Sequence, residues 1–197
     1  MCLSVPLRRP PSPGRALLKA TYIDQSPNSN ASAECRPPGL PWQLDLNFPF
    51  QIFQSRNVVV FAFEEYHGLF NVRIDPRPRA SAERAYMGDS VGRWDGDTLV
   101  IETRNFKRAL WLDVDGAPLS RNGRLVHRIR KIDYDTAKLE IITTVYDAEM
   151  YTAPWSVVRT FAWRPDKMIF GEYNCEYQVG APGGITRYGL VPEPTEE

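Results

Sequence analysis

The sequence contains little histidine and little cysteine, and this limits the chemistry that it can support. It has two histidines and three cysteines, Cys2, Cys35 and Cys175, and no two cysteines have the CxxC spacing of zinc or redox sites. We therefore expect neither a metal nor a cofactor. An oxidising compartment would allow Cys35 and Cys175 to pair, whereas in the cytoplasm both are expected to stay reduced.

An excess of charge and long apolar segments are also absent. Lys and Arg total 24 and Asp and Glu total 24, so no net charge attracts nucleic acid or an anionic membrane surface. Apolar runs such as 58–63 are far shorter than the roughly 18–20 residues of a membrane helix. The segment 1–20 lacks the apolar core of a secretory signal. These absences predict a cytoplasmic protein with no nucleic-acid or membrane partner.

Proline divides the chain into regions. Nine of the 17 prolines lie in the first 50 residues, where they prevent regular strand ladders and long helices. A length of 197 residues with 43% hydrophobic residues suits one domain with one substantial core. We predict a proline-rich N-terminal arm over residues 1–40, a β-barrel domain over 41–180 and a C-terminal tail over 181–197.

The region after the arm has the pattern of β-strands. Apolar residues alternate with polar ones from Trp42 to Ile52, which is typical of a half-buried strand. Only 79–86 and 147–151 look helical, and both are too short to connect parallel strands. Further strands are indicated by runs of β-branched and aromatic residues at 57–65, 98–103, 138–146, 156–163 and 168–175.

Short turns between these segments favour antiparallel neighbours. Asp95-Gly96, Asp115-Gly116 and Asn122-Gly123 are typical hairpin dipeptides. A long sheet without helices to cover it buries one face most simply by closing on itself. The sequence therefore predicts an all-β fold, an antiparallel meander closed into a lipocalin-like barrel with room for a small ligand.

Candidate catalytic residues follow the apolar run at 58–63. Glu64, Glu65 and His67 combine carboxylates with an imidazole, a pair that exchanges protons near neutral pH. A turn with solvated charges is the alternative interpretation. Asp113 and Asp147 lie in polar loops, where they would orient or polarise a substrate. The Asp-Gly pairs do not have EF-hand spacing, and hairpin turns already explain them.

Candidate ligand-binding residues are one histidine and a set of aromatic residues. His127 alternates with Leu125 and Ile129, which places it on an apolar face, unless Arg128 and Arg130 form the inward set. Aromatic rings offer flat apolar surface with a polar atom at one end, although filling of the core explains them equally well. The aromatic candidates are Trp94, Trp111, Tyr146, Tyr151, Trp155 and Tyr173.

One long motif resembles a known family. The stretch MGDSVGRWDGDTLVIET at residues 87–103 is similar to a family of uncharacterised bacterial proteins, and the likeness extends over about 35–177. Shorter matching motifs are CRPPG at 35–39, WLD at 111–113, YTAPW at 151–155 and YNCE at 173–176. The resemblance implies the barrel fold and no particular reaction.

The chain departs from the family pattern at several places. Members usually carry an export signal, a His-Pro-His segment where this chain has Ala117-Pro118-Leu119, and a glutamate near the position of His127. If the polar residues of the family form a site, this chain retains Glu64, His67, Asp113 and Asp147 but lacks the histidine pair.

These observations lead to two hypotheses of function. The first is a cofactor-independent acid/base enzyme, an isomerase, cyclase or dehydratase, that acts on a hydrophobic small molecule inside the barrel, for example in a biosynthetic pathway. The second is a binding or carrier barrel without chemistry. Motifs of serine nucleophiles, phosphate loops and dinucleotide sites are missing from the sequence. A homodimer is compatible with either hypothesis.

Overall fold

The structure is a computed structural model that describes residues 2–4, 38–46, 48–74, 84–85, 87–107, 110–113, 115–133, 138–164, 185–186 and 189–190. Within these residues the protein is all-β, as the sequence predicts, and its only helices are two short 3-10 helices. Neither helix has the length and apolar character that crossing a membrane requires. Cys35, Tyr173, Cys175 and the predicted strand at 168–175 lie outside the described residues.

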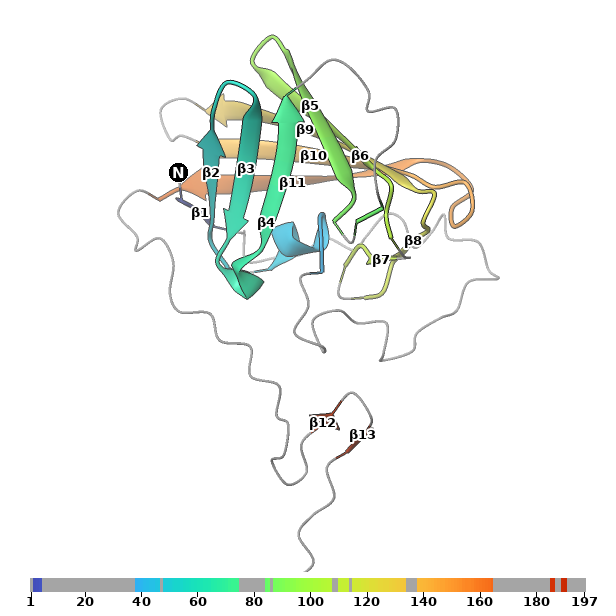
Figure 1. The fold of residues 1–197 in the computed structure, drawn as a ribbon. Coiled ribbons are helices and arrows are strands. Elements are labelled where there is room, and N and C mark those ends of the chain that lie inside the picture. Colours follow the sequence, from blue (N-terminus) through green and yellow to red (C-terminus); the bar gives the residue numbers. More distant parts are fainter. Residues whose placement is uncertain are drawn as a thin grey trace, which may run out of the picture.

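Eight strands form one large sheet that curls into a half-barrel (Figure 1), in the order β11-β10-β9-β6-β5-β4-β3-β2. The bounds of these strands are β2 Phe50–Gln54, β3 Val58–Phe63, β4 Leu69–Ile74, β5 Asp89–Asp95, β6 Thr98–Arg104, β9 Arg124–Asp133, β10 Lys138–Tyr146 and β11 Trp155–Trp163.

Shorter elements complete the described fold. Strand β1, Cys2–Ser4, pairs with β11 and with β2 through two residue pairs on each side. Two separate hairpins are formed by β7, Leu110–Trp111, with β8, Pro118–Leu119, and by β12, Ile185–Thr186, with β13, Gly189–Leu190. The 3-10 helices are η4, Trp42–Asp45, and η5, Glu65–His67.

The prediction of an antiparallel sheet is wrong at one junction, because β4 and β5 run parallel, with Arg73 opposite Val91 and Ile74 opposite Gly92. Two parallel neighbours need a connection that returns the chain to the end of the sheet at which the first strand begins, and the connection over 75–88 is long enough for this. Gly92 permits the close approach of these strands, since a Cβ atom there would lie 2.8 Å from the Cγ1 of Val72. The other neighbours within the sheet are antiparallel.

The predicted strand from Trp42 to Ile52 is also only partly correct. Its first part forms η4, and β2 begins only at Phe50. Trp42, Gln43 and Leu44 are all buried in η4, which a strand with one exposed face would not allow. Figure 1 shows η4 at one end of the curled sheet, and Leu40 and Leu44 pack against the residues that fill its interior.

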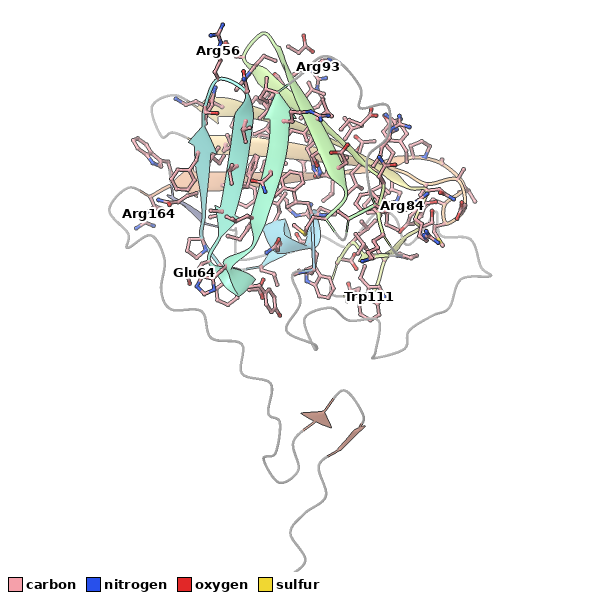
Figure 2. All side chains as sticks on the ribbon, in the orientation of Figure 1. Arg56, Glu64, Arg84, Arg93, Trp111 and Arg164 are labelled. Atoms are coloured by element: carbon pink, nitrogen blue, oxygen red, sulfur yellow. The ribbon has the colours of Figure 1, made fainter. Side chains whose placement is uncertain are left out.

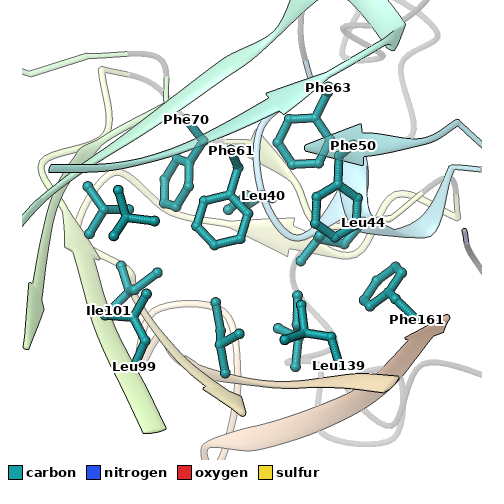
Figure 3. Close-up of a cluster of buried hydrophobic side chains, with 14 residues drawn as sticks. Leu40, Leu44, Phe50, Phe61, Phe63, Phe70, Leu99, Ile101, Leu139 and Phe161 are labelled. Carbon is teal, nitrogen blue, oxygen red and sulfur yellow. The ribbon is translucent and has the colours of Figure 1, made fainter. Parts of the chain in front are cut away.

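Phenylalanine rings fill the interior of the curled sheet (Figure 3). Phe50 is central among them, with ring centroids 5.4 Å from Phe63, 6.1 Å from Phe61 and 5.1 Å from Phe161. Phe161 lies on β11 and the other two on β3, so Phe50 joins the two sides of the half-barrel. Offset and edge-on ring pairs of this kind add to the stabilisation that comes from burial.

A second apolar cluster lies around the β7–β8 hairpin, and it joins this hairpin to the loop between β10 and β11. Its buried members are Phe106, Leu110, Leu112, Ala117, Leu119, Leu125, Val145, Tyr151 and Trp155.

Replacing Phe50 with Ala tests the role of the central ring. Phe50 is 1% exposed, so the substitution leaves a cavity and is expected to reduce the free energy of unfolding by about 3–5 kcal/mol in urea denaturation. Phe53 is 53% exposed on the same strand, and Phe53→Ala, the matched control, should change the free energy by no more than about 0.5 kcal/mol. Equal losses for the two variants would contradict this description of the core.

Candidate functional site

A pocket of about 530 Å³ opens at the end of the half-barrel where the β2–β3 and β5–β6 hairpins turn. In Figure 2 this end carries Arg56 and Arg93, whereas Glu64 lies at the opposite end. Most of the pocket wall consists of aliphatic and aromatic side chains from five strands. These are Ile52, Val59, Phe61, Leu99, Ile129 and Leu139.

The mouth of the pocket is more polar than its wall. Trp94 is two residues after Gly92 on β5, so it has the same orientation as the inward-facing Ser90 and Gly92. The residue is 47% exposed at the mouth. Asp97, Arg130 and Lys131 also border the opening. The Nε of Arg130 donates a hydrogen bond of 2.7 Å to Glu140. The pocket therefore combines an apolar interior with a polar rim, as small-molecule sites commonly do.

The predicted acid/base residues lie at the other end of the half-barrel. Strand β3 ends at Phe63, and η5 turns Glu65 inward and leaves His67 exposed, so these two side chains do not share a face. Glu64 is half-buried at the start of η5. Tyr66 and His67 have φ values of 56° and 47°, a left-handed conformation that non-glycine residues seldom adopt.

Glu65 is the most unusual titratable group at this end. It is 6% exposed, its Oε2 has no hydrogen-bond partner, and burial raises its pKa to about 7. The Nε2 of Gln43, from η4, lies 3.4 Å from the backbone oxygen of Glu65. A carboxyl group with this pKa can release and accept a proton near neutral pH.

The two predicted aspartates are buried and hold loops in place. The Oδ1 of Asp113 accepts a hydrogen bond of 2.9 Å from the backbone N–H of Ala117 in the β7–β8 hairpin. Asp147 accepts hydrogen bonds from the backbone N–H and hydroxyl of Ser120, at 2.6 and 3.0 Å, and from the N–H groups of Glu149 and Met150. Neither carboxylate lines the 530 Å³ pocket.

Most of the predicted aromatic residues also lie away from this pocket. Trp111 stacks on Trp42 with ring centroids 6.1 Å apart. The hydroxyl of Tyr151 donates a hydrogen bond of 2.7 Å to the backbone oxygen of Pro118, and its ring meets that of Trp155 edge-on at 5.5 Å. Of the aromatic candidates in the described residues, Trp94 alone lines the pocket.

A smaller surface hollow of about 330 Å³ brings three of the predicted residues together, namely Tyr146, Asp147 and Tyr151. The guanidinium of Arg124 lies 3.8 Å from the centre of the Tyr146 ring and also donates a hydrogen bond of 3.1 Å to Glu102. Since Asp147 and Tyr151 already form hydrogen bonds within the protein, the hollow offers few groups that are free to react.

His127 belongs to a polar group inside the half-barrel. It is 1% exposed, whereas Arg128 and Arg130 lie on the outer face, so the inward alternative for His127 is correct. Its Nδ1 is 2.9 Å from the Oγ1 of Thr143, and its ring meets Phe70 edge-on. Burial and the charge of Arg159 lower the pKa of His127 to about 3, so the imidazole is neutral at physiological pH.

The sequence analysis did not identify Arg159 or Thr143 as members of a polar group. Arg159 lies on the inward face of β11 between Val157 and Phe161, and its Nε donates a hydrogen bond to Asp45 of η4. A charged residue on the apolar face of a predicted strand is the signal that would have identified it. Thr143 gives no such signal, because threonine is common in strands.

Among the described residues, no three His, Cys, Asp or Glu side chains gather as metal ligands would. Comparison of the chain with protein-family models, with curated proteins and with solved structures gave no match. The resemblance to the bacterial family stays a prediction.

The variant Glu65→Gln tests the burial of the carboxyl group. Folding raises the pKa of Glu65 from 4.5 to about 7, so between these pH values the folded protein holds a proton that the unfolded chain has released. Wild-type stability therefore falls as the pH rises through this window. The variant does not titrate at this position, so its stability relative to wild type should increase from pH 4.5 to 7, by about 1–3 kcal/mol in total.

Urea denaturation between pH 4 and pH 8 measures this difference, and Glu64→Gln, at the half-buried neighbour, is the matched control. A stability difference between Glu65→Gln and wild type that does not change with pH would show that the carboxyl group ionises as freely in the folded protein as in the unfolded chain.

Proposed function

We propose that this protein is a barrel that binds a hydrophobic small molecule in the 530 Å³ pocket. The observation that carries the proposal is the apolar wall of this pocket, together with its position at the end of the half-barrel opposite Glu64 (Figure 2) and the helix η5 that follows it. The volume lies within the roughly 300–1,000 Å³ of ordinary ligand sites. A pocket with such walls favours binding over acid/base chemistry at this end.

Closure of the sheet belongs to the same proposal. The two-sided pairing of β1, Leu3 with Trp163 and Leu3 with Phe50, supports a lipocalin-like barrel in which this strand joins β11 to β2. The N-terminal region predicted as a proline-rich arm would then contribute one strand to the barrel. Packing of Leu40 and Leu44 against the interior supports a barrel that is closed at the end opposite the mouth.

The rim gives the ligand a second type of contact. Trp94 is half-exposed beside the opening, so its ring can cover the part of a ligand that remains outside the apolar wall. Lys131 and Asp97 place charges of both signs at the same opening, so the mouth has no strong preference for one charge. These features suit a ligand that is mostly apolar.

An acid/base enzyme is the second candidate, and the raised pKa of Glu65 is the observation that favours it. In this case Glu65 would transfer the proton in an isomerisation, cyclisation or dehydration, with Glu64 and His67 beside it. If Glu65→Gln and His67→Ala both leave the turnover of a confirmed substrate intact, this candidate fails.

Blocking the pocket tests the binding proposal. Ile52 lines the pocket and is only partly buried, so Ile52→Trp adds bulk inside the pocket with limited disturbance of the core. The uncharged dye Nile red should bind the wild-type protein with increased, blue-shifted emission, and Ile52→Trp should weaken its binding at least tenfold in a fluorescence titration.

Phe53→Trp is the matched control, because Phe53 is the next residue on β2 and is exposed on the other face. This variant should bind Nile red as the wild type does. Equal binding by all three proteins, or no binding by the wild type, would overturn the proposal.

A further inference from the structure

The polar group formed by His127, Thr143 and Arg159 occupies neighbouring inward positions of β9, β10 and β11. His127 is paired opposite Thr143, and Arg159 is paired opposite Ile141, the next inward residue of β10. Ile129 and Leu99 line the pocket and are paired opposite each other, and the next inward pair along the same two strands is His127 with Ile101. Two residues along a strand correspond to roughly 7 Å. Along β9, His127 is therefore the inward-facing residue next to Ile129, on the side away from the pocket mouth.

Two nitrogen atoms of this group have no partner. The Nε2 of His127 and the Nη1 of Arg159 are both buried without a hydrogen bond. Buried polar atoms in folded proteins nearly always have a partner, because an unpaired one forfeits its hydrogen bonds to water. Both atoms belong to side chains that point into the interior, so the missing partner is to be sought there.

The charges of the group limit what that partner can be. Arg159 is already paired with the carboxylate of Asp45, whose side chain is 6% exposed. His127 is neutral, as its lowered pKa requires. A carboxylate placed here would be a second negative charge beside Arg159, and burying such a charge is costly. An uncharged oxygen atom avoids this cost.

A carbonyl oxygen has the acceptor chemistry that both nitrogen atoms require. If the hydroxyl of Thr143 donates to Nδ1 of His127, the proton of the neutral imidazole lies on Nε2, which is then a donor. Arg159 has only donors. A carbonyl oxygen has two lone pairs and accepts from both groups.

We propose that His127 and Arg159 bind the carbonyl oxygen of an uncharged hydrophobic ligand whose apolar part occupies the 530 Å³ pocket. This inference rests on the proposed binding function and deepens it by naming the ligand class, a ketone or ester. Along their strands, Leu99 and Ile129 lie between the rest of the pocket and the level of His127, so their side chains must change rotamer when the carbonyl group enters.

Three probes of similar shape test the ligand class, namely benzophenone, diphenylmethane and diphenylacetate. Their Kd values come from displacement of Nile red from the full chain. In the wild type, benzophenone should bind more tightly than diphenylacetate. The Kd ratio of diphenylmethane to benzophenone should fall about tenfold in His127→Phe, because the variant removes one hydrogen bond to the carbonyl oxygen. Arg128→Met, on the outer face beside His127, is the matched control and should leave the ratio unchanged.

The outcomes separate the inference from the function on which it rests. An unchanged ratio in His127→Phe, or diphenylacetate binding as tight as that of benzophenone, overturns the carbonyl site and leaves the binding barrel intact. If neither Nile red nor any of the three probes binds, both proposals fail.

A second measurement is made on the wild-type protein, so its result does not depend on whether a core variant folds. The chain has two histidines, so ¹⁵N-histidine labelling gives signals from two imidazoles, and the signal that remains in His67→Ala, a substitution at an exposed position, identifies His127. Benzophenone should shift the Nε2 resonance of His127 in the wild type, and diphenylmethane should shift it less. Equal shifts with the two compounds would overturn the proposal.

Discussion

Burial of the inner face of one curled sheet is the constraint on which the rest of this structure depends. The strands carry apolar residues at alternate inward positions. Because the part of the chain that the structure describes has no long helix to cover them, the sheet fills its own interior. Phe50 provides the central contact, because its ring touches side chains from both sides of the half-barrel. Filling with rings is dense at one end, where η4 also packs, and incomplete at the other, where the pocket remains.

This uneven filling separates the titratable groups from the pocket. Glu65 is buried in the 3-10 helix that follows β3, at the end opposite the pocket mouth. Its carboxyl group, despite the raised pKa, is therefore too far away to exchange a proton with a molecule held against Leu99 and Ile129. His127 is the inward-facing polar residue next to Ile129 on β9, and it is neutral and hydrogen-bonded to Thr143. The interior is therefore suited to holding an uncharged molecule.

The sequence predicted the elements whose signal is local. The run of β-branched and aromatic residues at 138–146 gave the bounds of β10, and 98–103 matches β6 to within one residue. The sequence did not predict elements whose structure depends on residues far away in the chain. Trp42 and Leu44 alternate as a strand would, yet they form η4 because three consecutive side chains can be buried there against the sheet. The parallel pairing of β4 with β5 depends on a long connection and on the small size of Gly92, neither of which produces a periodic pattern.

The roles of residues in the candidate site were also difficult to predict from the sequence. Titratable residues near strand ends were identified from their types, but burial and partners determine what they do. The sequence suggests that Asp147 orients a substrate, and the structure shows that its carboxylate accepts hydrogen bonds from Ser120 and the following turn. The pocket wall consists of ordinary strand residues such as Leu139, which nothing in the sequence distinguishes from the rest of the core.

The central claim, that the ligand occupies the apolar pocket, is tested most directly by NMR. Backbone amide shifts of the ¹⁵N-labelled protein would be mapped during titration with Nile red. The account predicts that shifts are largest at Leu99, Ile129 and Leu139 and negligible from Glu64 to Gly68. Shifts confined to Glu64–Gly68, with none at the pocket wall, would contradict it.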